Sequence, residues 1–169
     1  MKYKIKRMLA MAGCLLLRDG NKKADYLRKS KLFKYFGKDV FWYPRVLPAK
    51  MYRVEIHNNV VIATDVCFCT HDISFLFQIK RLKLNGGRYN WSTGDIAVHD
   101  NVFIGAKAII KYGVTMGSNT VVAMRSVVTK NVAPNTVVGE KPARKICTYE
   151  EYASKTIERQ NMEFLYKWN

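Results

Sequence analysis

Residues 98–128 read VHDNVFIGAKAIIKYGVTMGSNTVVAMRSVV. From Val98 onward an apolar residue recurs at every sixth position: Val98, Ile104, Ile110, Met116, Val122 and Val128. The position four residues after each of these holds a small or β-branched residue: Val102, Ala108, Val114, Thr120, Ser126 and Val132. The same phase appears upstream at Ile56, Ile62 and Phe68. This period of six matches neither the period of two of a half-buried strand nor the 3.6-residue period of a helix.

A period of six predicts a coil with flat sides. When a large apolar residue and then a small one point inward, each hexad forms one short strand and one tight corner, and three hexads close a triangular coil. Glycine and asparagine at Gly105, Gly113, Asn101 and Asn119 permit such corners. Stacked coils bury one another's aliphatic side chains, so the pattern predicts a parallel β-helix solenoid. A sandwich of ordinary strands is the alternative, and its period of two disfavours it.

The chain divides into three zones. Residues 1–35 are rich in lysine with apolar residues at helical spacing, so we expect one or two basic helices there. The β-helix extends over residues 36–147. Its rhythm is interrupted between positions 73 and 95, which predicts a loop extruded from the solenoid, a natural place for a site in a repeat protein. Residues 148–169 open with a capping box, Thr-Tyr-Glu-Glu, and predict a C-terminal helix.

The charge of the chain indicates anionic partners without choosing among them. Its 169 residues include 29 Lys and Arg against 13 Asp and Glu, a net charge of +16. Nucleic acid, an anionic membrane surface, a phosphorylated cofactor and acidic sugars all fit such a field. No apolar run approaches the roughly 18 residues that a transmembrane helix needs. Residues 1–17 crudely match a secretion signal, but their short apolar run favours a basic helix packed on the domain.

Four stretches of the chain resemble the hexapeptide-repeat O-acetyltransferases. These stretches are 102–110, 113–117, 126–130 and 142–146, and the resemblance covers about residues 36–155. It is closest to the maltose and galactoside acetyltransferases and to those that modify bacterial surface polysaccharides. The resemblance implies a left-handed β-helix, a homotrimer, acetyl-CoA as the donor and active sites shared between neighbouring subunits.

His71 is the candidate general base. It lies where the hexad rhythm stops, in Thr70-His71-Asp72, which resembles the family's catalytic histidine motif. A histidine that is largely neutral at pH 7 suits the removal of a proton from an acceptor hydroxyl. Asp72 is expected to orient His71 or the acceptor. The resemblance places the backbone donor to the oxyanion at Ala106. A purely structural role is the alternative for His71.

The resemblance also assigns the donor-binding positions, which are Phe103, Gly105, Ala106, Met124, Thr129, Lys130 and Arg144. An arginine such as Arg144 suits the 3′-phosphate of CoA because its guanidinium bonds two oxygens at once. Phe103 replaces the family's usual tryptophan and packs either on the pantetheine arm or in a trimer interface. Met124 stands where the family has a small residue, so it narrows the thioester pocket or changes the choice of acyl group.

The remaining histidines and the cysteines are weaker candidates. His57 and His99 lie 14 and 28 residues from His71, which is not the close pair of a zinc site, so no metal is expected. Cys67 and Cys69 raise the idea of a thiol nucleophile, but two same-side positions on a strand favour surface or interface packing. The four cysteines contain no CxxC pair, which indicates reduced thiols in a cytoplasmic protein.

Acetyl transfer from acetyl-CoA to a sugar hydroxyl, of a surface polysaccharide or its precursor, is therefore the leading hypothesis. The high positive charge favours an anionic or membrane-attached acceptor, with peripheral contact at the inner face of the membrane. N-acetylation of an amino sugar or a xenobiotic is the second hypothesis. A non-catalytic basic scaffold or nucleic-acid-binding solenoid is the third, but no recognition fold is evident, so no nucleic-acid partner is expected.

Overall fold

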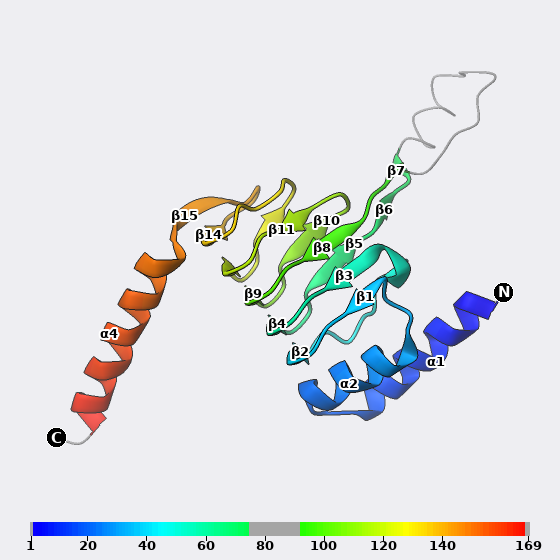
Figure 1. Ribbon diagram of the computed structural model, residues 1–169, viewed down its shortest axis with the longest axis horizontal. Helices are drawn as coiled ribbons and strands as arrows, with labels where there is room; N and C mark the ends of the chain where they lie inside the picture. Colours follow the sequence, from blue (N-terminus) through cyan, green and yellow to red (C-terminus); the bar gives the residue numbers. More distant parts are fainter. Residues whose placement is uncertain (1, 75–91, 168–169) are drawn as a thin grey trace.

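The computed structural model describes residues 2–74 and 92–167. Helices α1 (Lys2–Leu16) and α2 (Gly20–Ser30) stand at one end of a stack of short strands, and α4 (Tyr149–Lys167) leaves the other end (Figure 1). A single 3-10 turn, η1 (Met51–Arg53), precedes the second coil of the stack. The order of elements is that of a solenoid with helical segments at both ends.

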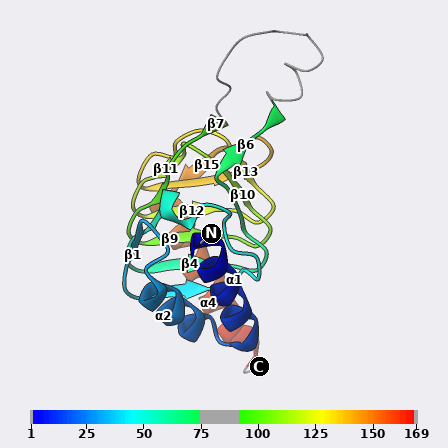
Figure 2. The ribbon, with the colours of Figure 1, turned by 90° about the vertical axis from the view of Figure 1, so that its right-hand side faces the viewer.

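Three of the four sheets in the described residues are the faces of a triangular coil, seen along its axis in Figure 2. Face A consists of β1 (Tyr35–Phe36), β3 (Val54–Ile56), β8 (Ile96–Val98) and β11 (Thr115–Met116). Face B consists of β2 (Val40–Trp42), β4 (Val60–Ile62), β9 (Val102–Ile104), β12 (Thr120–Val122), β14 (Thr136–Gly139) and β15 (Arg144–Thr148). Face C consists of β5 (Cys67–Cys69), β10 (Ile109–Lys111) and β13 (Val127–Val128). All pairs within these faces are parallel except β14 with β15, so the predicted parallel β-helix is confirmed.

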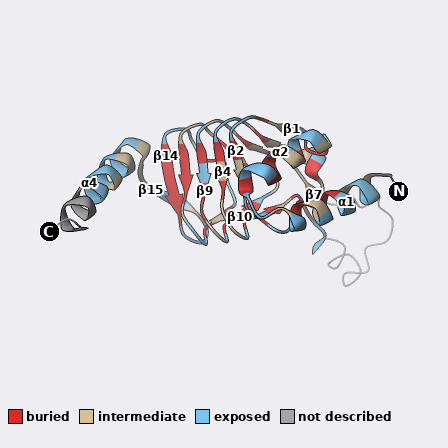
Figure 3. Cartoon of the chain, turned by 90° about the horizontal axis from the view of Figure 1, so that it is seen from below, coloured by how far each residue is buried: buried red, intermediate tan, exposed pale blue. Residues whose placement is uncertain are grey.

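The residues of the period-six pattern form the core of the solenoid. The six apolar positions from Val98 to Val128 are each at most 1% exposed. The small or β-branched residues four positions after each of these are buried as well. The two polar ones, Thr120 and Ser126, each donate a hydrogen bond within their own corner. Thr120 donates its hydroxyl to the Gly117 carbonyl and Ser126 to that of Ala123, both at 2.7 Å. The buried residues lie inside the stack, whereas the described part of α4 is mostly exposed (Figure 3).

The extruded loop begins and ends in a short antiparallel pair. Strand β6 (His71–Asp72) leaves the solenoid and pairs with β7 (Ser92–Thr93), which returns to it. The predicted loop covers residues 73–95, and its central part, 75–91, lies outside the described residues. The pairing places His71 at the point where the chain leaves the corner between faces C and A.

An asparagine ladder holds the corners between faces A and B. Asn59, Asn101, Asn119 and Asn135 occupy equivalent positions in successive coils, each with a φ between 52° and 58°. The amide of each of the first three donates to the side-chain oxygen of the next, at 2.8–3.0 Å. Asparagine tolerates this left-handed conformation better than most residues, and its side chain here also links the coils.

Replacement of the central ladder residue tests this role. We expect Asn119→Ala to lower the free energy of unfolding by about 1–3 kcal/mol, because alanine pays the left-handed backbone penalty and both ladder contacts are lost. Asn119→Gly is the matched control, since it loses the same contacts without that penalty, and should cost less. Urea unfolding followed by circular dichroism measures both. An equal loss of unfolding free energy in the two variants would show that the left-handed backbone conformation adds nothing to the cost of Asn119→Ala.

Candidate active site

His71 lines a pocket on the outer side of the solenoid. The pocket has a volume of about 550 Å³ and is walled by residues 46–49, by residues 65–71 and by Arg7 of α1. The His71 side chain is half-buried, and its Nδ1 lies 3.5 Å from the hydroxyl of the buried Thr70. Arg7 is fixed by hydrogen bonds to the carbonyls of Leu47 and Pro48, both at 3.1 Å. An imidazole therefore faces a space large enough for a small acceptor, beside a permanent cation.

Asp72 takes part in the turn that follows His71. Its carboxylate accepts a hydrogen bond from the Ser74 N–H at 2.7 Å. This hydrogen bond is the main reason that the pKa of Asp72 lies below its ordinary value, so the side chain is ionised at neutral pH. Its exposed carboxylate is thus engaged with the base of the extruded loop, and its predicted orienting role remains a prediction.

The two cysteines of β5 lie beside each other in the His71 pocket. Cys67 is exposed and Cys69 is half-buried, and their sulfur atoms are 3.7 Å apart. Burial, with a smaller contribution from Cys67, raises the pKa of Cys69 to about 11. A thiol that remains protonated at pH 7 is a poor nucleophile, so the geometry favours packing over catalysis for Cys69.

Four of the predicted donor-binding residues meet in one apolar cavity. Phe103 lies in β9, Gly105 and Ala106 form the corner after it, and Met124 occupies the equivalent corner of the next coil. The cavity has a volume of about 440 Å³ and is completed by residues that the sequence analysis did not identify: Ala63, Val121, Ala123, Val137, Ile146, Cys147 and Tyr152. Met124 is 69% exposed and Phe103 42%, so both present apolar surface to whatever fills the cavity.

The corner at Gly105 has a demanding backbone geometry. A Cβ atom at this position would lie 2.6 Å from the Met124 nitrogen, so only glycine lets the two coils approach this closely. The neighbouring N–H groups of Gly105 and Lys107 donate to the carbonyls of Val122 and Thr64. Among the hydrogen bonds of the described residues, none is donated by the Ala106 N–H. This amide is therefore available at the edge of the cavity, as an oxyanion donor must be.

The predicted phosphate-binding residues lie near the C-terminal end of the solenoid and do not line this cavity. Thr129 and Lys130 follow β13 and Arg144 begins β15, and all three are exposed. The two segments are joined because the Ala143 N–H donates to the Val127 carbonyl at 2.8 Å. Strand β15 itself, an antiparallel addition to face B, is an element that the period of six does not predict.

Within one chain the two halves of the predicted site line different pockets. His71 belongs to the pocket at β5, whereas Phe103, Ala106 and Met124 line the cavity between faces B and C. The corner between faces C and A carries His71, whereas the corner between faces B and C carries Gly105, Ala106 and Met124 of the predicted donor-binding set. A single chain therefore contains both His71 and the predicted donor-binding residues but does not bring them into one pocket.

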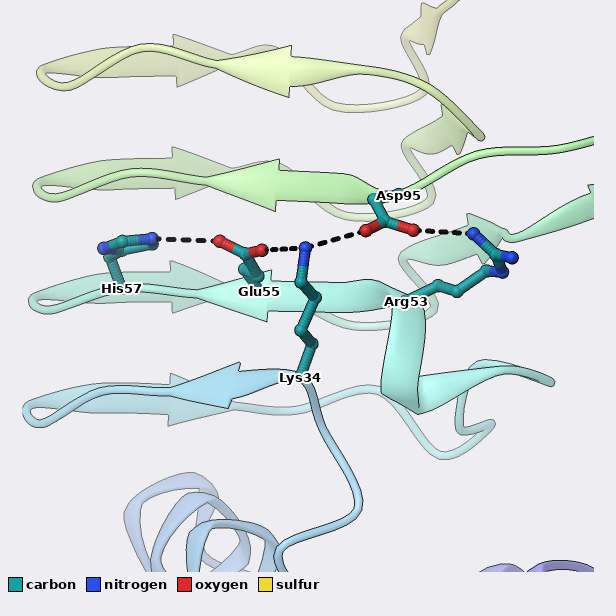
Figure 4. Close-up of polar contacts among 5 residues, drawn as sticks. All are labelled: Lys34, Arg53, Glu55, His57 and Asp95. Atoms are coloured by element: carbon teal, nitrogen blue, oxygen red, sulfur yellow. Dashed lines mark hydrogen bonds and ion pairs between the residues drawn. The ribbon is translucent and has the colours of Figure 1, made fainter.

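A polar cluster on face A was not predicted. Figure 4 shows Lys34 between two carboxylates, with its Nζ 2.6 Å from Glu55 and 2.7 Å from Asp95, while Arg53 binds the second oxygen of Asp95 at 2.8 Å. These contacts lower the pKa values of both acids and raise that of Lys34 to about 12. His57 Nε2 lies 3.6 Å from Glu55, at the end of the row. The pairs are largely exposed, so they hold the outer surface of the first coils together without forming a catalytic centre.

The structure offers no evident metal site in residues 2–74 and 92–167. No group of three or more His, Cys, Asp or Glu side chains in these ranges is arranged to hold an ion. The rings of His57 and His99 do lie beside each other, with centroids 4.9 Å apart and planes tilted by 36°, but on a different corner from His71.

Comparisons with known proteins support the resemblance. No protein-family model matches the chain. It is 39% identical over 119 residues to protein CapG of Staphylococcus aureus, covering 70% of this chain and 64% of CapG. It is 36% identical over 95 residues to galactoside O-acetyltransferase of Escherichia coli K12, covering 56% of this chain and 44% of that protein. The chain therefore spans between 44% and 64% of the length of these curated relatives.

Solved structures share the whole architecture. A hexapeptide-repeat acetyltransferase of Vibrio cholerae, solved with acetyl-CoA, superposes with a TM-score of 0.64 at 23% identity, over 88% of this chain and 87% of that one. Maltose O-acetyltransferase of Clostridium difficile 630 gives a TM-score of 0.61 at 25% identity, over 86% and 87% of the two chains. The fold is thus the left-handed β-helix of the hexapeptide-repeat proteins. The chain is therefore similar to the hexapeptide-repeat acetyltransferases in both sequence and fold.

The protonation of Cys69 can be measured directly. We expect its alkylation by iodoacetamide to be slow at pH 7 and to rise about tenfold per pH unit until the pH nears 11, because only the thiolate reacts. Peptide-resolved mass spectrometry of the intact protein gives the rate for each cysteine. A rate for Cys69 that levels off near pH 8.5, as for an ordinary free thiol, would contradict this assignment.

Proposed function

We propose that the protein transfers an acetyl group from acetyl-CoA to a hydroxyl of a sugar, in a surface polysaccharide or its precursor. The observation that carries the proposal is the edge where Phe103, Ala106 and Met124 line an apolar cavity, which strand β15, with the exposed Arg144 at its start, helps to complete. Acetyl-CoA, which has a long arm with phosphates at one end, fits this edge. The names of two relatives, a galactoside and a maltose O-acetyltransferase, support a sugar acceptor. In this proposal the enzyme works in the cytoplasm, beside the inner face of the membrane.

The proposed mechanism needs no covalent intermediate on the enzyme. His71 accepts the proton of the acceptor hydroxyl while that oxygen attacks the thioester carbonyl, and then returns the proton to the departing CoA thiolate. The Ala106 N–H donates to the oxygen that becomes negative during the attack. Asp72 keeps the turn after His71 in place through the hydrogen bond that it accepts from the Ser74 N–H.

A homotrimer completes the site in this proposal. His71 and the donor-binding edge lie on different corners of one chain, so a threefold assembly that sets one corner against the next chain's other corner unites them. Exposed apolar side chains along the donor-binding edge support an interface there. These are Phe103, Met124, Ile146, Tyr152 and Ile157.

Removal of the imidazole tests the mechanism. We expect His71→Ala to lower kcat by about 10²–10⁴-fold, because the acceptor proton loses its base, while the KM for acetyl-CoA and the oligomeric state stay unchanged. His99→Ala is the matched control, since that half-buried histidine lies on another corner, and it should keep wild-type kcat. The measurement is release of CoA thiol across a panel of saccharides that includes galactosides and maltose. Full activity of His71→Ala would overturn the mechanism.

The assignment of Arg144 to the 3′-phosphate has its own test. We expect Arg144→Ala to raise the KM for acetyl-CoA about tenfold, because a bidentate charged contact is lost. The KM for acetyl-dephospho-CoA, which lacks that phosphate, should change little. Lys155→Ala, an exposed cation on α4, serves as the charge control. An equal rise in KM for acetyl-CoA and for acetyl-dephospho-CoA would show that Arg144 does not bind the 3′-phosphate.

A further inference from the structure

The inward face of helix α1 is fixed to the body of the protein. Ala10 and Cys14 are at most 2% exposed. The Tyr3 hydroxyl donates to the Ala49 carbonyl at 3.2 Å and accepts from the Met51 N–H at 2.8 Å. With the two hydrogen bonds of Arg7 to the Leu47 and Pro48 carbonyls, one side of α1 is held at several points along its length.

The opposite face of α1 is apolar and uncovered. Its exposed side chains are Ile5 (48%), Met8 (61%), Leu9 (60%), Ala12, Leu15 (61%) and Leu16 (85%). At 100° per residue these six fall within about 120° of the helix circumference, opposite the face that is held. We name these six residues the outer stripe. Exposed apolar residues in such a continuous row mark an interaction site more often than scattered single ones do.

Positive charge borders the outer stripe on both sides. Lys4 and Lys6 are exposed and fall on the two flanks of the stripe, and α1 contains no acidic residue. Further exposed cations follow the helix at Arg18 and Lys22. An apolar stripe between lysines is the arrangement of a helix that lies in the plane of an anionic membrane surface.

We propose that the outer stripe docks α1, parallel to the bilayer, into the headgroup region of an anionic membrane. The 15 residues of α1 extend only about 22 Å, less than the roughly 30 Å of a hydrocarbon core. Among the described residues, no helix has the length and apolar content that a membrane crossing requires. A second copy of α1 would bring only further positive charge to the stripe, because the helix contains no acidic residue, whereas anionic headgroups neutralise Lys4 and Lys6.

The docked helix also bears on the position of the site. Arg7, on the inward face of α1, lines the His71 pocket, so a bound α1 holds that pocket near the headgroups. The docking itself rests on α1 alone and stands whether or not the chain transfers acetyl groups.

Sedimentation with vesicles tests the proposal on the intact 169-residue chain. We expect wild-type protein to bind phosphatidylcholine vesicles that contain about one third phosphatidylglycerol, and to bind pure phosphatidylcholine at least tenfold more weakly. Leu9→Ser/Leu15→Ser should reduce binding to the anionic vesicles about tenfold or more. Lys4→Gln/Lys6→Gln should also reduce it about tenfold, as should raising the salt to about 0.5 M.

Variants on the outer faces of the solenoid are the controls. Tyr35 and Ile109 are 45% and 39% exposed on β1 and β10, so Tyr35→Ser/Ile109→Ser removes two exposed apolar side chains outside α1 and should leave vesicle binding unchanged. Thermal unfolding should show each variant folded, because substitutions at exposed positions change stability little. The proposal is overturned if the two double serine variants lose vesicle binding equally, or if the wild-type protein does not bind the anionic vesicles. So does a change of oligomeric state in Leu9→Ser/Leu15→Ser, since the stripe would then be a protein interface.

Discussion

The stacking of equal coils is the constraint on which the rest of the structure depends. Val98 pairs with Met116, Ile104 with Val122 and Ile110 with Val128, so each inward aliphatic side chain rests on one exactly three hexads away. Ile62 and Ile104 pair as well, although they are 42 positions apart, 24 more than one coil. The extruded loop is thus tolerated because its two ends return the chain to the same register, through the antiparallel pair β6–β7. A loop that shifted the phase would expose the apolar residues of every later coil.

The same constraint explains why donor-binding residues converge. Ala106 and Met124 are 18 residues apart, and therefore occupy the same corner of successive coils, so a period read from the sequence already places them side by side. The corner asparagines Asn101 and Asn119 were predictable from the same 18-residue spacing, and the capping box at the start of α4 depends on residues only three positions apart. Thr148 and Glu151 exchange the two hydrogen bonds that the pattern implies.

Features that depend on contacts between residues far apart in the chain could not be predicted from the sequence. Arg7 reaches the His71 pocket through carbonyls some 40 positions later, and Lys34 meets Asp95 across 61 positions, so no local pattern marks either contact. Strand β15 pairs antiparallel with β14 through an irregular register, which a repeat of six does not foresee. The uncovered side of α1 was likewise unpredictable, because the amphipathic pattern of a helix does not say which of its faces the body covers. Part of the high net charge lies in the basic residues that flank this uncovered side, where the proposal assigns them to anionic headgroups.

The central claim is that two corners of the solenoid, contributed by neighbouring chains, form one active site. Co-expression of His71→Ala with Met124→Glu, which places a negative charge at an exposed donor-edge position, tests it most directly. Each variant alone should be inactive in CoA thiol release. Mixed trimers purified through two tags should recover about a third of wild-type activity, because one of the three interfaces in each mixed trimer pairs an intact His71 with an intact edge. Mixed oligomers that remain as inactive as the parents would show that the site lies within one chain.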